Sequence, residues 1–134
     1  MKVGCLFVTE RAMPKCILLV DDNAVIRRML RAAFEQPGWE VCGEAVNGQD
    51  AIDKAQDLKP DLIVLDLSMP VMNGLEAAPV LRHMMPTVPI ILFTLYHNEV
   101  LVRRASSAGI TAVISKADSV NTLIHQADDL LRAA

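Results

Sequence analysis

The sequence predicts an α/β fold in which a parallel sheet lies between two layers of helices. Four short apolar runs, at residues 16–20, 62–65, 90–93 and 112–114, have the composition of strands buried on both faces of such a sheet. Between these runs, apolar residues recur at helical spacing, with polar residues on the opposite side. Strands and helices therefore alternate along the chain, the order typical of a parallel sheet with helical crossovers.

The first half of the chain marks the boundary of each element. Pro37-Gly38 ends the helix that follows the first apolar run. Residues 39–44 alternate like a half-buried strand near the edge of the sheet. Asn47-Gly48 opens the second helix, and Lys59-Pro60 leads into the next strand.

The second half repeats this pattern. A third helix is expected over about residues 74–85, and Pro79 within it predicts a kink or a late start. Gly109 closes a fourth helix over about residues 98–108, and Ser119 can cap the last helix. The repeats predict a flavodoxin-like (βα)5 three-layer sandwich with strand order 2-1-3-4-5.

These repeats fill residues 15–134 as one domain, and residues 1–14 stand outside them as an N-terminal extension. The extension either forms an extra strand over residues 3–8 or comes from an upstream start codon, because Met13 is an equally sensible start. A chain of 134 residues leaves no room for a second domain of ordinary size.

The charge of the chain argues against one class of partner. A net charge of −3 and the lack of a long basic run predict no direct binding of nucleic acid. Arg27, Arg28 and Arg31 are typical of one solvated helix face.

Cysteine usage and hydropathy bear on the location of the protein. Cys5, Cys16 and Cys42 are odd in number and scattered, which predicts buried free thiols in a reducing compartment. No apolar run reaches the length of a membrane span, and the N-terminus lacks a convincing cleavage site for export. We therefore expect a cytoplasmic protein with no membrane partner.

Each of the four apolar runs leads into residues with reactive side chains. The first is followed by Asp21-Asp22 and the second by Asp66, the third ends at Thr94, and the fourth leads through Ser115 to Lys116. Because the carboxyl ends of parallel strands lie at one edge of a sheet, we expect these side chains to meet there. Any one of them alone is typical of a helix cap, a strand residue or a solvated charge, but packing does not require all of them at one edge.

The three carboxylates predict a site for a divalent cation. Like charges a few ångströms apart repel one another and raise one another's pKa. Mg²⁺, or Mn²⁺, relieves this repulsion because it binds carboxylate and carbonyl oxygens and keeps some water ligands. Asp66 has a second possible role, since a carboxylate can attack phosphorus beside a metal ion and a cation such as Lys116, and Thr94 offers a hydroxyl donor.

Over about residues 15–133 the chain resembles the receiver domain of two-component response regulators. Val20-Asp21-Asp22-Asn23 is similar to the acidic pair of that family, and residues 66–74 are similar to its phosphoacceptor loop. Thr94 is similar to the switch hydroxyl of the family, and Lys116 to its lysine.

The resemblance implies a phosphorylation-activated signalling switch and not a conventional enzyme. A histidine kinase or phosphotransfer protein would donate a phosphoryl group to Asp66, and Thr94 and Lys116 would then contact that group. The domain would assist its own phosphorylation and dephosphorylation. The implied Mg²⁺ ligands are the side chains of Asp22 and Asp66, the backbone carbonyl of Ser68 and, through a metal-bound water, Asp21.

The same resemblance implies an output surface. Phosphorylation would rearrange the face made by the fourth helix, fifth strand and fifth helix, which would bind an unknown downstream protein or a second copy of the chain. Residues 94–99 and Arg103-Arg104 are similar to the subfamily that carries a helix-turn-helix output domain. No output domain follows here, so we expect either a stand-alone receiver or part of a longer protein.

Departures from the family pattern leave alternatives open. Val113 stands where an aromatic switch residue is common and Leu95 where a small residue is common, which keeps a pseudo-receiver that signals by binding alone as an alternative. Tyr96 either replaces the missing aromatic residue or covers the rim of the site. A small Mg²⁺-dependent phosphohydrolase would place a second Asp where Ser68 stands, and a flavin-binding module would need a phosphate loop in place of Asp21-Asp22.

Overall fold

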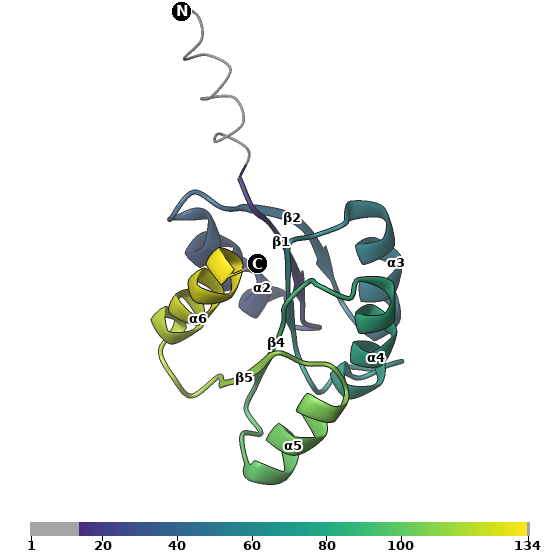
Figure 1. Cartoon of the computed structure of the whole chain (residues 1–134). Helices are drawn as coiled ribbons and strands as arrows, with labels where there is room; N and C mark the ends of the chain where they lie inside the picture. The colour runs from purple at the N-terminus through teal and green to yellow at the C-terminus, as the bar shows by residue number, and fades with distance from the viewer. Residues whose placement is uncertain (1–13, 134) are drawn as a thin grey trace, which may run out of the picture.

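The computed structural model describes residues 14–133, in which five strands alternate with five helices (Figure 1). The predicted N-terminal extension, residues 1–14, lies outside the described residues apart from Pro14. In chain order the elements are β1 (Cys16–Val20), α2 (Ala24–Glu35), β2 (Glu40–Ala45), α3 (Gly48–Leu58), β3 (Leu62–Leu65), α4 (Gly74–Met84), β4 (Ile90–Thr94), α5 (Glu99–Ser107), β5 (Ala112–Ser115) and α6 (Val120–Ala133).

The strands form one parallel sheet in the order β2-β1-β3-β4-β5, which confirms the predicted topology. Strands β1 and β3 are direct neighbours, with Val20 opposite Leu65, so the strands that lead into Asp21 and Asp66 end side by side. At the other edge, β4 pairs with β5, and Thr94 lies opposite Ser115. Figure 1 shows α2 and α6 on one side of the sheet and α3, α4 and α5 on the other.

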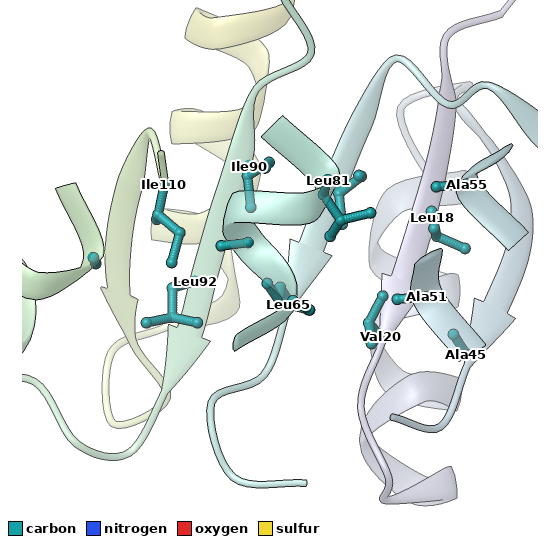
Figure 2. Close-up of a cluster of buried hydrophobic side chains, with 14 of the residues drawn as sticks. Leu18, Val20, Ala45, Ala51, Ala55, Leu65, Leu81, Ile90, Leu92 and Ile110 are labelled. Carbon is teal, nitrogen blue, oxygen red and sulfur yellow. The ribbon is translucent and has the colours of Figure 1, made fainter. Parts of the chain in front are cut away.

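Each strand supplies side chains to two separate cores. Leu18 and Val20 of β1 pack in the core that α3, α4 and α5 cover, together with residues such as Leu81 (Figure 2). Ile17 and Leu19 point to the opposite core, under α2 and α6. Because both faces are covered, nearly every residue of β1, β3 and β4 is buried, which explains why their sequences are continuous apolar runs.

Asparagine side chains start most of the helices. The N-cap residues of α2, α3, α4 and α5 are all Asn, and each side chain accepts a hydrogen bond from a backbone N–H of the first turn. Helix α4 begins at Gly74 with a capping box between Asn73 and Glu76, so Pro79 lies inside it and the alternative of a late start is wrong. None of the helices within residues 14–133 has both the length and the apolar character that crossing a membrane requires.

A disulfide joins Cys16 of β1 to Cys42 of β2, so the expectation of free buried thiols is wrong for this pair. Both residues are only half-buried, and their Cα atoms lie 5.5 Å apart. The ladder between β1 and β2 is irregular here: Ile17 pairs with Val41 and Leu18 pairs with Gly43, so Cys42 is an additional residue without a partner in the ladder. The disulfide therefore links the edge strand β2 covalently to its neighbour β1.

Breaking this disulfide should destabilise the fold. A cross-link over a sequence separation of 26 residues restricts the unfolded chain and typically contributes roughly 2–4 kcal/mol. We expect Cys42→Ser to lower the free energy of unfolding by about that amount in urea titrations without reductant. Cys5→Ser, which leaves the bond between Cys16 and Cys42 intact, is the matched control. Equal stability of Cys42→Ser and the parent protein would contradict the disulfide.

Candidate functional site

Three carboxylates gather at the carboxyl edge of the sheet, as the sequence predicts. Asp21, Asp22 and Asp66 each offer a carboxylate oxygen, and these oxygens lie within 4.8 Å of one another. Asp21 and Asp66 are buried, whereas Asp22 is exposed. The grouping follows directly from the pairing of β1 with β3, because each strand delivers an Asp at the same level of the sheet.

Lys116 follows the edge strand β5 and brings a cation to this cluster. Its Nζ lies 2.9 Å from a carboxylate oxygen of Asp21 and 3.2 Å from one of Asp66. The Lys116 backbone N–H donates to the Thr94 carbonyl at 2.8 Å, which fixes the residue where β5 ends. Burial alone would lower the pKa of Lys116, but the hydrogen bond that its ammonium donates to Asp21 and the charges of both carboxylates raise the pKa above its ordinary value.

The charge of the cluster is not balanced by this one lysine. Burial, and after it the charge of Asp21, raise the pKa of Asp66 above its ordinary value, although Lys116 and the backbone N–H of Leu67 act in the other direction. A buried carboxylate whose charged form remains disfavoured beside a lysine is a ligand that a divalent cation would stabilise. The residues at this edge therefore fit the predicted Mg²⁺ or Mn²⁺.

Thr94 lies at the end of β4 with its side chain buried. Its Oγ1 accepts a hydrogen bond from the Tyr96 backbone N–H at 3.1 Å. That contact uses a lone pair of the hydroxyl oxygen, so the hydroxyl hydrogen can still be donated to an incoming anion. Tyr96 itself is 58% exposed, and Val113 is half-buried on the side of the sheet that α5 covers.

The loop after Asp66 packs closely under the site. The Asp66 side chain accepts from the Leu67 N–H at 2.9 Å, and the Gly74 N–H donates to the Leu67 carbonyl at 2.9 Å. A Cβ atom at position 74 would collide with the Asp66 carbonyl oxygen, so only glycine fits there. Val71 takes a left-handed backbone conformation with φ 69°, which is strained for a β-branched residue.

Ser68 is exposed on the solvent side of this loop. It lines an open groove of about 630 Å³ together with Asp22, Asn73 and Arg104, among other residues. Of the predicted site residues, Asp22 and Ser68 thus face the groove, whereas Lys116 contacts Asp66 and Asp21 away from it.

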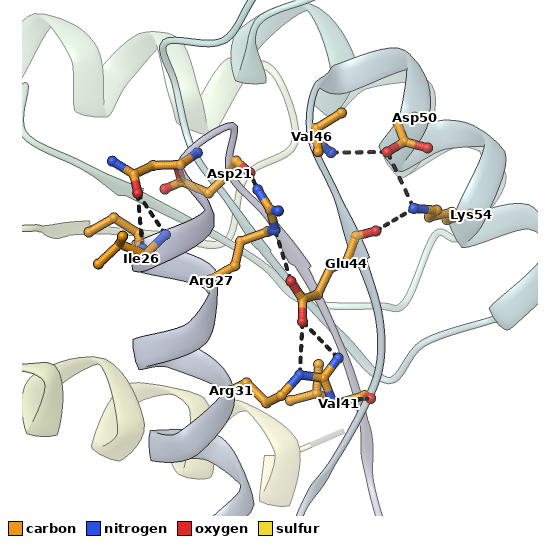
Figure 3. A network of polar contacts seen from close by, with 11 residues as sticks. Asp21, Ile26, Arg27, Arg31, Val41, Glu44, Val46, Asp50 and Lys54 are labelled. Carbon is orange, nitrogen blue, oxygen red and sulfur yellow. Dashed lines mark hydrogen bonds and ion pairs between the residues drawn. The ribbon is translucent and has the colours of Figure 1, made fainter.

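Arg27 connects the acidic loop to β2, a role that the sequence analysis missed. Its guanidinium donates to the Asp21 carbonyl at 2.7 Å and to the Glu44 carboxylate at 2.8 Å (Figure 3). Arg31 pairs with the same carboxylate at 2.8 Å. Burial would raise the pKa of Glu44, but the two arginines lower it below its ordinary value. The expected solvated face is therefore wrong for Arg27, whose side chain is only 15% exposed.

The fold and the residues at its carboxyl edge define a class: a flavodoxin-like α/β domain with a carboxylate and lysine site. The chain belongs to the response regulator receiver domain family, whose sequence model matches residues 17–128.

Curated relatives support this membership. The chain is 38% identical over 104 residues to the chemotaxis protein CheY of Thermotoga maritima, a match that covers 78% of this chain and 87% of CheY. It is 36% identical over 115 residues to the transcriptional regulatory protein PdtaR of Mycobacterium tuberculosis, covering 86% of this chain and 56% of PdtaR. The chain thus spans most of that CheY but only about half the length of the transcriptional regulators it matches.

Solved structures agree with the fold. A LuxR-family response regulator from Aurantimonas has a TM-score of 0.85 at 27% identity, covering 90% of this chain and 86% of the other. The chemotaxis protein CheY4 of Vibrio cholerae has a TM-score of 0.82 at 28% identity, covering 87% of this chain and 98% of the other.

The raised pKa of Asp66 predicts how a neutral side chain changes stability. The folded protein binds a proton at Asp66 more tightly than the unfolded chain, so the stability that this group contributes at low pH is lost as pH rises through the folded pKa. Asp66→Asn mimics the protonated form and should raise Tm by a few degrees at about pH 7 without Mg²⁺, with little effect at about pH 3.

Calorimetry at both pH values checks this expectation. Asp57→Asn removes an exposed carboxylate of α3 and is the matched control, for which we expect no comparable rise. A lower Tm of Asp66→Asn at neutral pH would show that the ionised carboxylate stabilises the fold, contrary to the geometry of the cluster.

Proposed function

We propose that the protein is a phosphorylation-activated switch that accepts a phosphoryl group on Asp66 from a histidine kinase or a phosphotransfer protein. One observation carries the proposal: the Asp66 carboxylate lies between the Lys116 ammonium at 3.2 Å and two further carboxylates. Phosphoryl transfer needs a positioned acceptor and positive charge around the phosphoryl oxygens, and this edge supplies the acceptor and one cation.

A divalent cation would supply the remaining positive charge when bound. We assign Mg²⁺, or Mn²⁺, to Asp22, Asp66 and the backbone carbonyl of Ser68, with Asp21 acting mainly through a metal-bound water. The contacts support this division: the Asp21 side chain already accepts from Lys116 at 2.9 Å and from the Asn23 N–H at 2.9 Å. The Asp22 side chain has no hydrogen-bond or ion-pair partner among residues 14–133 and faces the groove.

The chain's own residues would then divide the chemistry. A carboxylate oxygen of Asp66 attacks phosphorus, the bond from phosphorus to the donor histidine nitrogen breaks, and its electron pair leaves with the imidazole. The product is a mixed anhydride of phosphate and the Asp66 carboxyl group. The Lys116 ammonium neutralises part of the negative charge on the phosphoryl oxygens, and the Thr94 hydroxyl donates a hydrogen bond to one of these oxygens.

The switch would act through the face made by α5, β5 and α6. Thr94 ends β4 and Lys116 follows β5, and the new phosphoryl group would change the partners of both side chains. The contacts at this end of β4 and β5 would therefore differ between the phosphorylated and unphosphorylated states. Exposed apolar residues support a binding role for this region, since Leu95, Tyr96 and Val100 are each more than half exposed. A downstream protein, or a second copy of the chain, would dock here.

Phosphorylation of Asp66 is tested by intact-mass spectrometry. Incubation with Mg²⁺ and phosphoramidate should add one phosphoryl group to the parent protein and none to Asp66→Asn. Asp57→Asn, which removes an exposed carboxylate, should still gain the group. A parent protein that gains no adduct would favour a pseudo-receiver.

The proposed metal ligands predict an order of affinities. Asp22→Ala should weaken Mg²⁺ binding by about tenfold or more, because a direct ligand is lost, and Asp21→Ala should weaken it less. Calorimetric titration of the two variants measures both constants. The reverse order would overturn the assignment of direct and water-mediated ligands.

The proposed role of Thr94 predicts a separation of phosphorylation from output. Thr94→Ala should gain the phosphoryl group on Asp66 but lose the phosphorylation-dependent change in amide hydrogen exchange of α5 and β5. Thr87→Ala, which removes an exposed hydroxyl in the loop before β4, is the control. An equal exchange response in Thr94→Ala and the parent protein would remove Thr94 from the switch.

A further inference from the structure

Arg104 of α5 faces the open side of the carboxylate cluster. It lines the groove of about 630 Å³ that also contains Asp22 and Ser68, and it is the one cationic residue lining that groove within residues 14–133. Asp22 in turn offers an oxygen within 4.8 Å of the Asp66 carboxylate. The groove therefore joins Asp22, which borders the buried Asp66, to Arg104 on α5.

The guanidinium has no acidic partner of its own. Within residues 14–133, Arg104 makes no ion pair and no side-chain hydrogen bond, unlike Arg27, Arg31 and Arg82, whose guanidinium groups bind carboxylates or backbone carbonyls. The neighbouring Arg103 is also exposed but does not line this groove. Arg104 is thus free to bind an anion that enters the groove.

We propose that Arg104 determines which small phosphodonors the site uses and favours acyl phosphates, the mixed anhydrides of phosphate and a carboxylic acid. This inference rests on the proposed phosphorylation of Asp66. An in-line attack by Asp66 drives the leaving group away from the buried carboxylate and toward solvent, which it reaches through the groove. Arg104 is a positioning residue there and not a catalytic one.

The charge of the leaving group explains the preference. With an acyl phosphate, the bond from phosphorus to the bridging oxygen breaks, and the electron pair leaves with the carboxylate as an anion that needs no proton. With phosphoramidate, the bond from phosphorus to nitrogen breaks, and the protonated nitrogen leaves as neutral ammonia. A guanidinium binds a carboxylate through paired hydrogen bonds but has no comparable attraction for ammonia.

The test compares two donors across matched variants. Rates of phosphorylation with acetyl phosphate and with phosphoramidate, at saturating Mg²⁺, are measured by intact-mass spectrometry for the parent protein, Arg104→Ala, Arg104→Lys and Arg103→Ala. We expect Arg104→Ala to lower the acetyl phosphate rate about fivefold and the phosphoramidate rate less than twofold. Arg104→Lys should recover most of the loss, and Arg103→Ala should leave both rates unchanged.

Each outcome distinguishes this inference from the proposed function. An equal loss with both donors would assign Arg104 a general electrostatic or structural role and overturn the inference while leaving phosphorylation of Asp66 intact. A ratio of rates that Arg103→Ala shifts as much as Arg104→Ala would overturn it as well. A parent protein that accepts a phosphoryl group from neither donor would overturn the proposed function itself. High salt should weaken the acetyl phosphate preference of the parent protein, because an exposed charge is screened.

Discussion

The ion pairs of Lys116 with Asp21 and Asp66 hold the functional edge of the sheet together. They join residues that are up to 95 positions apart in the chain and that follow three different strands. Removing the partner of a buried charge typically costs several kcal/mol, so the two carboxylates depend on this ammonium for their place in the fold. The position of Lys116 depends in turn on the pairing of β4 with β5, which places it level with the ends of β1 and β3.

One ammonium among three carboxylates leaves the edge with an excess of negative charge. The other cation that reaches this loop, Arg27, has its charge engaged by Glu44 and offers only a hydrogen bond to the Asp21 backbone. The excess is exposed where Asp22 and Ser68 open onto the groove. A metal ion and a phosphodonor would therefore approach from the same side, while Lys116 holds the carboxylates from within. The Arg104 guanidinium faces the same approach route from α5.

The parts of this arrangement that sequence could predict are those that repeat along the chain. Continuous apolar runs predicted β1, β3, β4 and β5. The position of Asp21, Asp66, Thr94 and Lys116 at the carboxyl edge of the sheet then followed from the predicted parallel order. Contacts between elements were harder to predict from the sequence. The pairing of Arg27 with Glu44 joins a helix to an edge strand with no periodic relation between the two residues.

Local irregularities of the backbone were also difficult to predict from the sequence. The bond between Cys16 and Cys42 forms where β2 carries an additional residue. Gly43 is a sign of such a bulge, but it does not predict which cysteines pair. The loop after Asp66 was expected from its similarity to the phosphoacceptor loop of the family, but the left-handed conformation fell on Val71, a residue type that rarely adopts it. The groove beside Arg104 could not be predicted, because it depends on how α5 lies relative to the loop after Asp66. No single segment of the sequence determines that arrangement.

The disulfide divides the sheet into a half that is covalently closed and a half that is not. The disulfide joins the start of β1 to β2. At the other end of β1, Arg27 donates hydrogen bonds to the Asp21 carbonyl and to Glu44 of β2. On the other side of β3, the described contacts between β4, β5 and the site are hydrogen bonds and ion pairs, which can exchange partners without breaking a covalent bond. A change of charge at Asp66 would therefore displace β2 less than β4 and β5. The structural response to that charge would spread mainly toward the β5 edge of the sheet.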